Sequence, residues 1–287
     1  MNGIITKGIG GFYYVKAADN TIYECKARGI FRKEKVKPYI GDKVEISIEN
    51  GKGTIERIYP RVSSMIRPPV ANIDILVIVV AAASPDPNLL LIDKLLINCE
   101  INRIKPIICI NKTDVKSGDI IKDIYENAGY TVVSVCAAEE RGFDDLLPHI
   151  KDKTSAFAGL SGVGKSTILN LLTSTNQETG EVSDKIQRGK HTTRHVELLE
   201  LNCGGFVLDT PGFSSFEVNT IKAQELYKYF PEMKDCEDLC RFKGCSHINE
   251  PDCVVKEKVL SGEIKKSRYE SYIELYNQLK MIKEWEK

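Results

Sequence analysis

A glycine-rich run that ends in Lys and Ser has the clearest chemistry in this 287-residue chain. The run is Gly159-Leu-Ser-Gly-Val-Gly164-Lys165-Ser166, and it lies between an apolar stretch and residues that predict a helix. Glycines let backbone N–H groups turn toward phosphate oxygens, and the helix N-terminus attracts the same anions. Lys165 would reach the β- and γ-phosphates, and Ser166 would ligate Mg²⁺. The run predicts a P-loop, whose nucleotide contacts we expect from Gly159, Leu160, Ser161, Gly162, Val163, Gly164, Lys165, Ser166 and Thr167.

A second motif, Asn111-Lys112-Thr113-Asp114, directly follows the apolar stretch Lys105–Ile110. In α/β sheets, ligands bind in the loops after the carboxyl ends of the strands. The Asp114 carboxylate can accept hydrogen bonds from guanine N1–H and the 2-amino group, whereas adenine offers neither donor. Asn111, Lys112 and Asp114 therefore predict guanine recognition. The alternative is an ATP-using hydrolase, which a nucleotide competition assay would distinguish.

Asp209-Thr-Pro-Gly212 ends another apolar stretch. Asp209 is suited to hold the magnesium shell, and the Gly212 N–H can meet the γ-phosphate. The polar segment Arg188-Gly-Lys-His-Thr-Thr-Arg194 lies between this motif and the P-loop. We interpret it as the first switch, ordered by nucleotide contacts and released on hydrolysis, with Thr193 as a magnesium ligand.

The order of the motifs is unusual. Cys136-Ala137 follows a predicted strand and could contact guanine through backbone N–H groups. With this pair included, the motifs occur in the order NKTD, CA, GLSGVGKS, DTPG. Ordinary small GTPases begin with the P-loop. This order, the RGKHTTR segment and the flanking regions resemble the RsgA (YjeQ/YloQ) family of bacterial GTPases that depend on the small ribosomal subunit. Related proteins often carry Ser-Ala where this chain has Cys136-Ala137, so we expect the backbone to make that contact.

The resemblance covers nearly the whole chain and implies three domains. Residues 1–67 would form an OB-type barrel, 68–218 a circularly permuted P-loop GTPase domain of α/β class, and 219–287 a helical zinc-binding domain. It also implies GTP and GDP as ligands, Mg²⁺ as cofactor, and the 30S ribosomal subunit with its rRNA as partner. The expected function is GTP hydrolysis in late maturation of that subunit. Nothing in the sequence demands a dimer, so we expect a monomer.

The catalytic helper is not the usual one. Phe213 follows DTPG where many GTPases keep a water-orienting Gln, and a hydrophobic side chain cannot position water. His191 is the obvious substitute, and the resemblance points to the same residue. We therefore expect His191, Thr193 and Lys165 to carry catalysis. The alternatives are a bystander histidine with a group supplied by the ribosome, a GTP-dependent switch with negligible turnover, or a permuted GTPase of the large subunit.

A closed metal site is predicted near the C-terminus by Cys240, Cys245, His247 and Cys253. Three thiolates and one imidazole complete a tetrahedral zinc site, which favours a structural over a catalytic role. The spacing matches the C-terminal motif of the family, including Glu250-Pro251. We expect one zinc per chain, with Cys236 as a bystander thiol. The alternative is a set of reduced cysteines beside a surface histidine.

The elements that position these residues follow from hydrophobic patterning. Short β-rich runs punctuated by Gly predict a small barrel, OB-type in preference to SH3-like: Gly3–Thr6, Phe12–Val15, Thr21–Cys25, Lys43–Ile48 and Thr54–Ile58. From Asn72 onward, alternating strands and helices predict a parallel sheet with helices on both faces. The strands are expected at Asp74–Ala83, Lys105–Ile110, Thr131–Cys136, Ser155–Ala158, Val196–Leu201 and Phe206–Asp209, and the helices at Leu89–Glu100, Ile120–Ala128 and after Gly164.

Charge is unevenly distributed along a chain whose formal net charge is zero. Residues 1–67 contain 13 Lys/Arg and 7 Asp/Glu, which predicts a contact with a polyanion, or alternatively a solvated lysine-rich surface. The longest apolar run, Ile75–Ala83, is about half the ~20 residues that a spanning helix needs. The first residues also lack the layout of a signal peptide. We therefore expect a cytoplasmic protein with no membrane partner.

Overall fold

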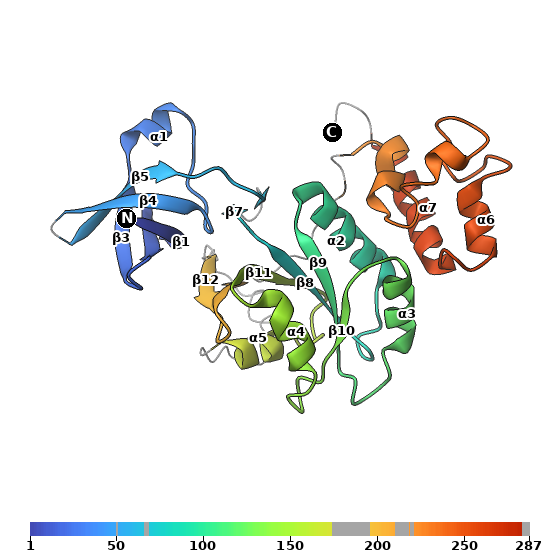
Figure 1. Ribbon diagram of the computed structural model, residues 1–287, viewed down its shortest axis with the longest axis horizontal. Helices are drawn as coiled ribbons and strands as arrows, with labels where there is room; N and C mark the ends of the chain where they lie inside the picture. Colours follow the sequence, from blue (N-terminus) through green and yellow to red (C-terminus); the bar gives the residue numbers. More distant parts are fainter. Residues whose placement is uncertain (50, 66–68, 174–195, 210–217, 219–220, 283–287) are drawn as a thin grey trace, which may run out of the picture.

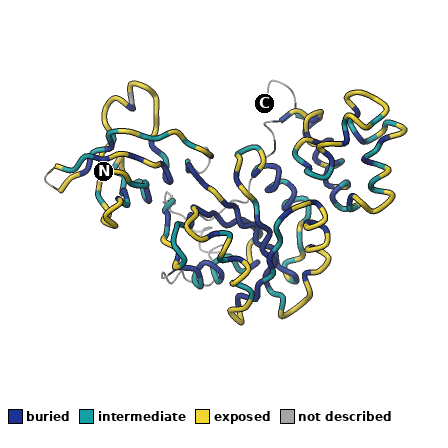
Figure 2. Tube along the Cα trace, in the orientation of Figure 1, coloured by how far each residue is buried: buried dark blue, intermediate teal, exposed yellow. Residues whose placement is uncertain are grey.

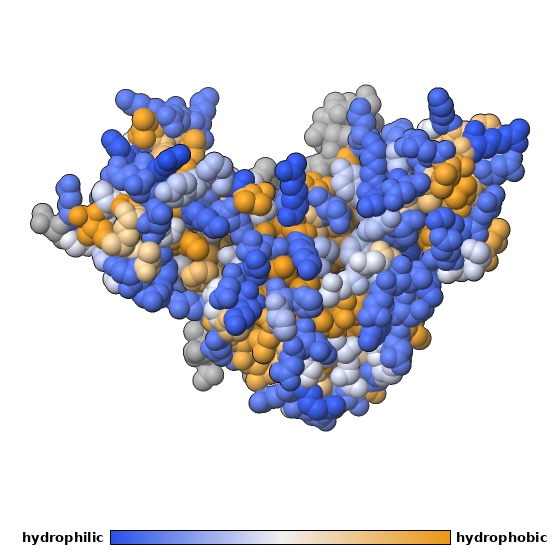
Figure 3. Space-filling view, viewed as in Figure 1, coloured by the Kyte–Doolittle hydropathy of each residue, from blue (hydrophilic) through white to orange (hydrophobic). Residues whose placement is uncertain are grey.

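The computed structural model describes residues 1–49, 51–65, 69–173, 196–209, 218 and 221–282. A β-barrel, a central α/β region and a C-terminal helical region lie side by side, with the α/β region between the other two (Figure 1). The outline is indented between the barrel and the C-terminal region (Figure 3). None of the described helices is long and apolar enough to cross a membrane.

Five strands close the N-terminal barrel: β1 (Asn2–Ile9), β2 (Phe12–Ala17), β3 (Ile22–Ala27), β4 (Lys43–Glu49) and β5 (Lys52–Ile58). They pair in the order β1-β2-β3-β5-β4, and β4 pairs again with β1 to complete the ring. The β3–β5 pair is parallel. Alternate apolar residues fill the interior, among them Val44 and Ile46 of β4. The basic connection between β3 and β4 contains the short helix α1 (Gly29–Lys33).

A short linker attaches the barrel to the central region. Its two-stranded sheet pairs β6 (Ser64–Met65) with β7 (Val70–Ala71). Arg61 donates to both carboxylate oxygens of the fully buried Asp42, at 2.7 and 2.8 Å. At Gly41, where φ is +85°, a Cβ would lie 2.0 Å from the Ala71 carbonyl oxygen, so only glycine permits this approach. These contacts tie the linker to the barrel.

The central sheet has the strand order β10-β9-β8-β11-β13-β12. Its members are β8 (Ile75–Ala81), β9 (Lys105–Asn111), β10 (Val132–Ser134), β11 (Lys153–Ala158), β12 (Glu197–Glu200) and β13 (Gly205–Asp209). All neighbours are parallel except β12, which runs antiparallel to β13. Every residue of β8 is buried because helices cover both faces of this strand. The buried strands cross the middle of the molecule in Figure 2.

Two helices cover each face of the central sheet. Ile78 of β8 packs in the cluster that contains residues of α2 (Leu89–Asn102) and α3 (Asp119–Asn127). Its neighbour Val79 faces α4 (Phe143–Ile150) and α5 (Lys165–Leu172). The expectation of helices on both faces is therefore correct. The patterning did not predict α4, which contains Pro148, a residue that usually disfavours a helix interior.

The C-terminal region is built from η2 (Ala223–Tyr229), η3 (Glu237–Leu239), α6 (Val254–Leu260) and α7 (Lys266–Met281). Phe230 and Tyr272 are almost fully buried in its core, with ring centroids 5.4 Å apart. The same apolar cluster includes Ile97 of α2. The C-terminal region therefore shares its core with the central region.

Candidate functional site

The nucleotide-binding motifs predicted from the sequence meet at one edge of the central sheet. Asn111 ends β9, Gly159 follows β11, and Asp209 ends β13. Cys136 lies two residues beyond the end of β10. Since these four strands are parallel, their carboxyl ends, and the motifs after them, lie on the same side. Asn111 thus contacts Val163, which lies 52 positions later in the sequence.

Close contacts require glycine at two P-loop positions. Gly159 has φ +144°, and a Cβ there would lie 2.2 Å from the Val79 carbonyl oxygen. Gly164, with φ +97°, caps α5, and a Cβ there would lie 2.2 Å from the Asn111 side-chain nitrogen. Val163 is buried, while Ser161 and Gly162 are exposed. The loop therefore presents its backbone at the N-terminus of α5, where anions are favoured.

Lys165 opens α5 and folds back over the P-loop. Its Nζ donates to the carbonyl oxygens of Gly159 and Leu160, at 3.0 and 2.6 Å. Burial lowers the pKa of Lys165, because the charged form loses solvation. An anion bound in the loop would restore the favourable environment of this ammonium. The half-buried Ser166 and Thr167 follow in the first turn of α5.

Asn111 connects three of the motifs. Its Nδ2 donates to the Val163 carbonyl oxygen of the P-loop at 2.9 Å, and its Oδ1 accepts from the Ala137 N–H at 3.0 Å. The side chain is buried, so both hydrogen bonds are shielded from water. Asn111 therefore holds the P-loop and the loop after β10 in register.

Asp114 has a partner that the sequence did not reveal. The Cys136 thiol donates to Asp114 Oδ1 at 3.2 Å, and the Thr113 hydroxyl donates to the Val135 carbonyl oxygen at 3.0 Å. The expectation that only the backbone of Cys136 would contribute thus missed this side-chain contact. Cys136 is buried while Asp114 is exposed, so the thiol contacts the carboxylate from the protein side. The other oxygen of Asp114 can face a base.

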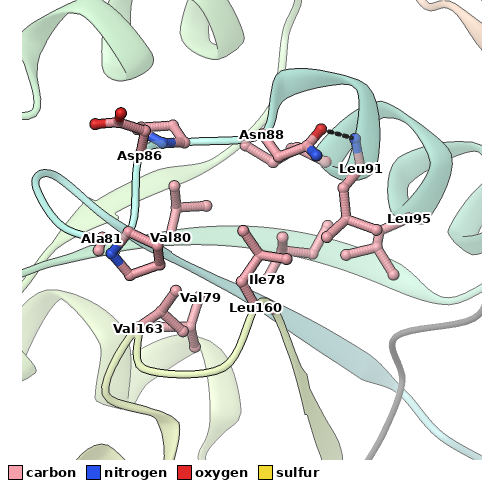
Figure 4. A pocket seen from close by; sticks show the side chains of 14 residues that line it. Ile78, Val79, Val80, Ala81, Asp86, Asn88, Leu91, Leu95, Leu160 and Val163 are labelled. Carbon is pink, nitrogen blue, oxygen red and sulfur yellow. Dashed lines mark hydrogen bonds between the residues drawn. The ribbon is translucent and has the colours of Figure 1, made fainter.

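An apolar hollow of about 280 Å³, open to solvent, lies beside the P-loop. Leu160 and Val163 line it from the loop, and Leu91 and Leu95 from α2 (Figure 4). The connection between β8 and α2 forms its rim, where the Asn88 side chain caps α2 by accepting from the Leu91 N–H at 2.9 Å.

The connection between β8 and α2 also contacts the guanine motif. Lys112 Nζ donates to the Ser84 carbonyl oxygen at 2.5 Å. No sequence motif marks residues 82–88 as part of the site.

Magnesium has two suitable oxygen donors in the described part of the chain. Ser166 supplies a hydroxyl after the P-loop, and Asp209 supplies a carboxylate at the end of a strand that neighbours β11. Hard oxygen ligands of this kind suit Mg²⁺. His191, Thr193, Gly212 and the neighbouring Phe213 lie outside the described residues.

The four predicted zinc ligands converge in the C-terminal region. The ligand atoms of Cys240, Cys245, His247 and Cys253 all lie within 4.8 Å of one another. His247 Nδ1 is 3.6 Å from the Cys240 sulfur and 3.5 Å from the Cys253 sulfur, and these sulfurs are 4.0 Å apart. A tetrahedral zinc ion would require about 3.6 Å between N and S and about 3.8 Å between sulfurs. The cluster therefore fits zinc, and Cys236 is not part of it.

Neighbouring residues hold the loop that carries these ligands. Glu250 accepts from the Ser246 N–H and hydroxyl at 2.9 and 2.7 Å, and from the Ile248 N–H at 3.2 Å. Burial alone would raise the pKa of Glu250, but these hydrogen bonds lower it to about 2. From α7, Tyr269 donates to the His247 carbonyl oxygen at 2.7 Å. These hydrogen bonds fix the loop that contains His247.

Comparisons with known proteins agree with this geometry. The RsgA GTPase family matches residues 58–219, and the RsgA N-terminal domain matches residues 2–55. A protein of Ruminiclostridium cellulolyticum, named small ribosomal subunit biogenesis GTPase RsgA, is 50% identical over 99% of this chain and 95% of its own length. A protein of the same name from Agathobacter rectalis is 45% identical, with 98% of each chain covered.

The chain belongs to the RsgA family.

Solved structures of RsgA relatives agree along nearly the full length. The crystal structure of YloQ, a circularly permuted GTPase, is 39% identical, with a TM-score of 0.81 over 97% of this chain and 94% of that chain. The structure of YjeQ from Thermotoga maritima is 34% identical, with a TM-score of 0.82 over 98% and 99%. The predictions of an RsgA-type GTPase and a circularly permuted α/β fold are therefore confirmed.

Proposed function

We propose that this RsgA-family GTPase acts in maturation of the small ribosomal subunit, binds its rRNA, and hydrolyses GTP faster on the subunit. The observation that carries the proposal is full-length similarity to proteins named small ribosomal subunit biogenesis GTPase. The N-terminal region adds support, because residues 1–67 have 13 Lys/Arg against 7 Asp/Glu. On the barrel, Lys26 Nζ lies 5.0 Å from the centre of the Phe12 ring, a pairing of charge and aromatic surface that suits nucleic acid.

The nucleotide site supports a division of roles. The P-loop backbone and Lys165 would bind the β- and γ-phosphates, and Asp114 would read guanine while Asn111 holds the two loops together. Mg²⁺, held by Ser166, Thr193 and the shell around Asp209, would stabilise charge on the transferred phosphoryl group. Water would attack in line, and His191 would position it because Phe213 cannot.

The chain is proposed to divide its work among three domains. Residues 1–67 bind rRNA, 68–218 bind and hydrolyse GTP, and 219–287 form a domain stabilised by one structural zinc ion. The N–S and S–S distances in the cysteine–histidine cluster support zinc. A closed four-ligand site leaves no position for substrate, so the metal would have no catalytic role.

The test compares GTP turnover with purified 30S and 50S particles. Intrinsic turnover should lie at about 10⁻⁴ to 10⁻² s⁻¹, the range of unassisted GTPases. The 30S particle should raise it by roughly 10²-fold because docking orders the catalytic groups. Equal rates with 30S, 50S and no particle would refute the proposal. Binding to 30S should also weaken as salt rises, by about one unit of log–log slope per phosphate contact.

Two variants assign the catalytic groups. His191→Ala should lose most of the stimulated turnover yet bind GTP and 30S nearly as well as the unaltered protein. Lys165→Ala should weaken nucleotide binding itself, because its ammonium contacts phosphate. Full stimulation of His191→Ala would mean that the ribosome supplies the catalytic group.

A further inference from the structure

Strand β1 has two different partners on the same edge. Its first half closes the barrel by pairing with β4, where Gly3 is opposite Val44. Its second half leaves the barrel, and Lys7 pairs antiparallel with Glu197 of β12 in the GTPase sheet. Between these halves the register of β1 with β2 shifts, from Ile5 to Lys7. Such a bulge bends a strand and redirects it, so β1 can serve both sheets.

The contact lies at the outer edge of β12, where Lys7 of β1 is opposite Glu197. An edge strand presents N–H and C=O groups with which another strand can pair. Two ion pairs reinforce the strand pairing. Lys7 Nζ lies 2.6 Å from Glu197 Oε2, and Lys16 Nζ of β2 lies 2.7 Å from Glu200 Oε1. The Lys7 and Glu197 side chains are 30% and 36% exposed, so solvent screens the pair only in part. The barrel and β12 are therefore joined by backbone pairing and by two ion pairs.

A single row of residues leads from the barrel to the proposed magnesium site. Lys7 is opposite Glu197, and Glu197 is opposite Asp209 on its other side. Two strand spacings separate Lys7 from Asp209, about 10 Å in total. Asp209 is the acid proposed to hold the magnesium shell, and it is opposite Glu197 of β12. A shift of β1 would therefore move the strand that lies beside Asp209.

We propose that β1 couples the barrel to the magnesium site, with Lys7 and Glu197 as positioning residues for GTP hydrolysis. Neither side chain belongs to a nucleotide-binding motif. They act by holding β12, and through it Asp209, in the position that Mg²⁺ requires. The part of the inference that concerns the ribosomal subunit rests on the proposed function: a polyanion that binds the barrel would act on hydrolysis through β1.

The test uses charge reversal and exchange in the full-length protein. Lys7→Glu and Glu197→Lys each replace attraction by repulsion, and the double variant restores an ion pair of opposite orientation. Each single variant should raise the Mg²⁺ concentration needed for half-maximal turnover by about three- to tenfold. This range is expected when the attraction in a partly screened ion pair is replaced by repulsion. Affinity for GDP without Mg²⁺ should not change, since the guanine and P-loop contacts are untouched. The double variant should recover most of the loss.

A readout without turnover accompanies the kinetics. Hydrogen exchange of the peptide that contains β12 should become faster in both single variants and return toward the unaltered rate in the double variant. Arg28→Glu is the matched control. It breaks a barrel ion pair, Arg28 with Glu56 at 2.8 Å, and changes the net charge as Lys7→Glu does, but both residues lie outside the β1–β12 contact. It should leave the Mg²⁺ dependence and the β12 exchange unchanged.

The outcomes separate this inference from the proposed function. With 30S particles, Glu197→Lys should lose stimulation although it adds positive charge, which a simple loss of RNA affinity cannot explain. Unchanged β12 exchange in both single variants, or faster exchange with unchanged Mg²⁺ dependence, would overturn the coupling. If 30S does not stimulate the unaltered protein, the proposed function fails, and the Mg²⁺ dependence of intrinsic turnover still decides the coupling.

Discussion

At the scale of single residues, the carboxylate proposed to read guanine is held by its neighbours. Asp114 accepts from the Cys136 thiol, and Asn111 fixes the loop that contains Cys136 by accepting from the Ala137 N–H. A thiol is a weak donor, so it leaves most of the acceptor capacity of Asp114 for a base. The contact holds one oxygen of the carboxylate against the protein.

Replacing Asp114 tests guanine recognition directly. Asp114→Asn presents an amide donor where guanine also has donors, and it should weaken GTP binding by at least ~2 kcal/mol. Affinity for xanthine nucleotides should rise, since their base carries an acceptor at that position. Titration with GTP, XTP and ATP measures the change. Equal GTP and ATP affinity in the unaltered protein would contradict the assignment of Asp114.

Substitutions at Cys136 test the thiol contact. Cys136→Ser keeps a donor and should bind GTP within about twofold of the unaltered protein. Cys136→Ala removes it and should weaken binding by about 0.5–1.5 kcal/mol, the usual contribution of one hydrogen bond. The paired variants have similar volumes, which separates donation from packing. Equal affinity of both variants would show that the thiol does not orient Asp114.

At the scale of elements, a buried ion cluster joins α7 to α2. Arg268 of α7 pairs with Asp93 of α2 and with Glu232, whose Oε1 is 2.7 Å from Arg268 Nε. All three side chains are at most 8% exposed, and the Tyr125 hydroxyl also donates to Asp93 at 3.0 Å. Burial raises the pKa of Asp93 although Arg268 opposes this. The arginine is therefore the group that keeps two buried acids compatible with the fold.

Removing this arginine should be costly. Arg268→Met leaves two acids without their cation, and we expect a loss of about 3–5 kcal/mol in the free energy of unfolding at neutral pH. Without Arg268, burial raises the pKa of Asp93 unopposed, so the folded variant is penalised at neutral pH and the penalty falls as Asp93 becomes protonated at lower pH. The deficit should therefore shrink toward about pH 4. Denaturant unfolding at several pH values measures this.

Lys266→Ala is the control on the same helix. Its exposed pair with Glu270 should contribute less than about 1 kcal/mol. An Arg268→Met variant no less stable than Lys266→Ala would contradict the role of the cluster.

At the scale of the whole molecule, we expect zinc to stabilise helix α2 of the central region as well as the C-terminal region that binds the metal. Ile97 of α2 belongs to the same apolar cluster as Cys245 and Cys253, two of the proposed zinc ligands. Removing zinc should unfold the C-terminal region, since its ligands would be left without a central ion. Hydrogen exchange should then also rise in α2, while the P-loop peptide stays protected. Metal analysis should find about one zinc per chain. Absence of zinc in protein purified without chelators would contradict the prediction.

Local patterns were sufficient for the motifs and for most elements. The P-loop, the NKTD motif and the cysteine–histidine cluster stood out in the sequence because the chemistry expected of them requires particular residue types at short spacing. The buried strand β8 was recognisable because all its positions are apolar. Helix α4 was missed because Pro148 masks a short amphipathic segment that tertiary packing stabilises.

The sequence by itself determined that this chain binds guanine nucleotide through permuted motifs, since each motif is a local arrangement of backbone and side chains. It could not show that Asn111 meets both the P-loop and Ala137, because that contact depends on parallel strands ending at one edge of the sheet. Nor could it show that Arg268 is buried or that β1 pairs with β12, since helical spacing and strand alternation do not identify distant partners. Those pairings depend on how the regions pack against one another, because the partners are separated by up to nearly 200 residues of sequence.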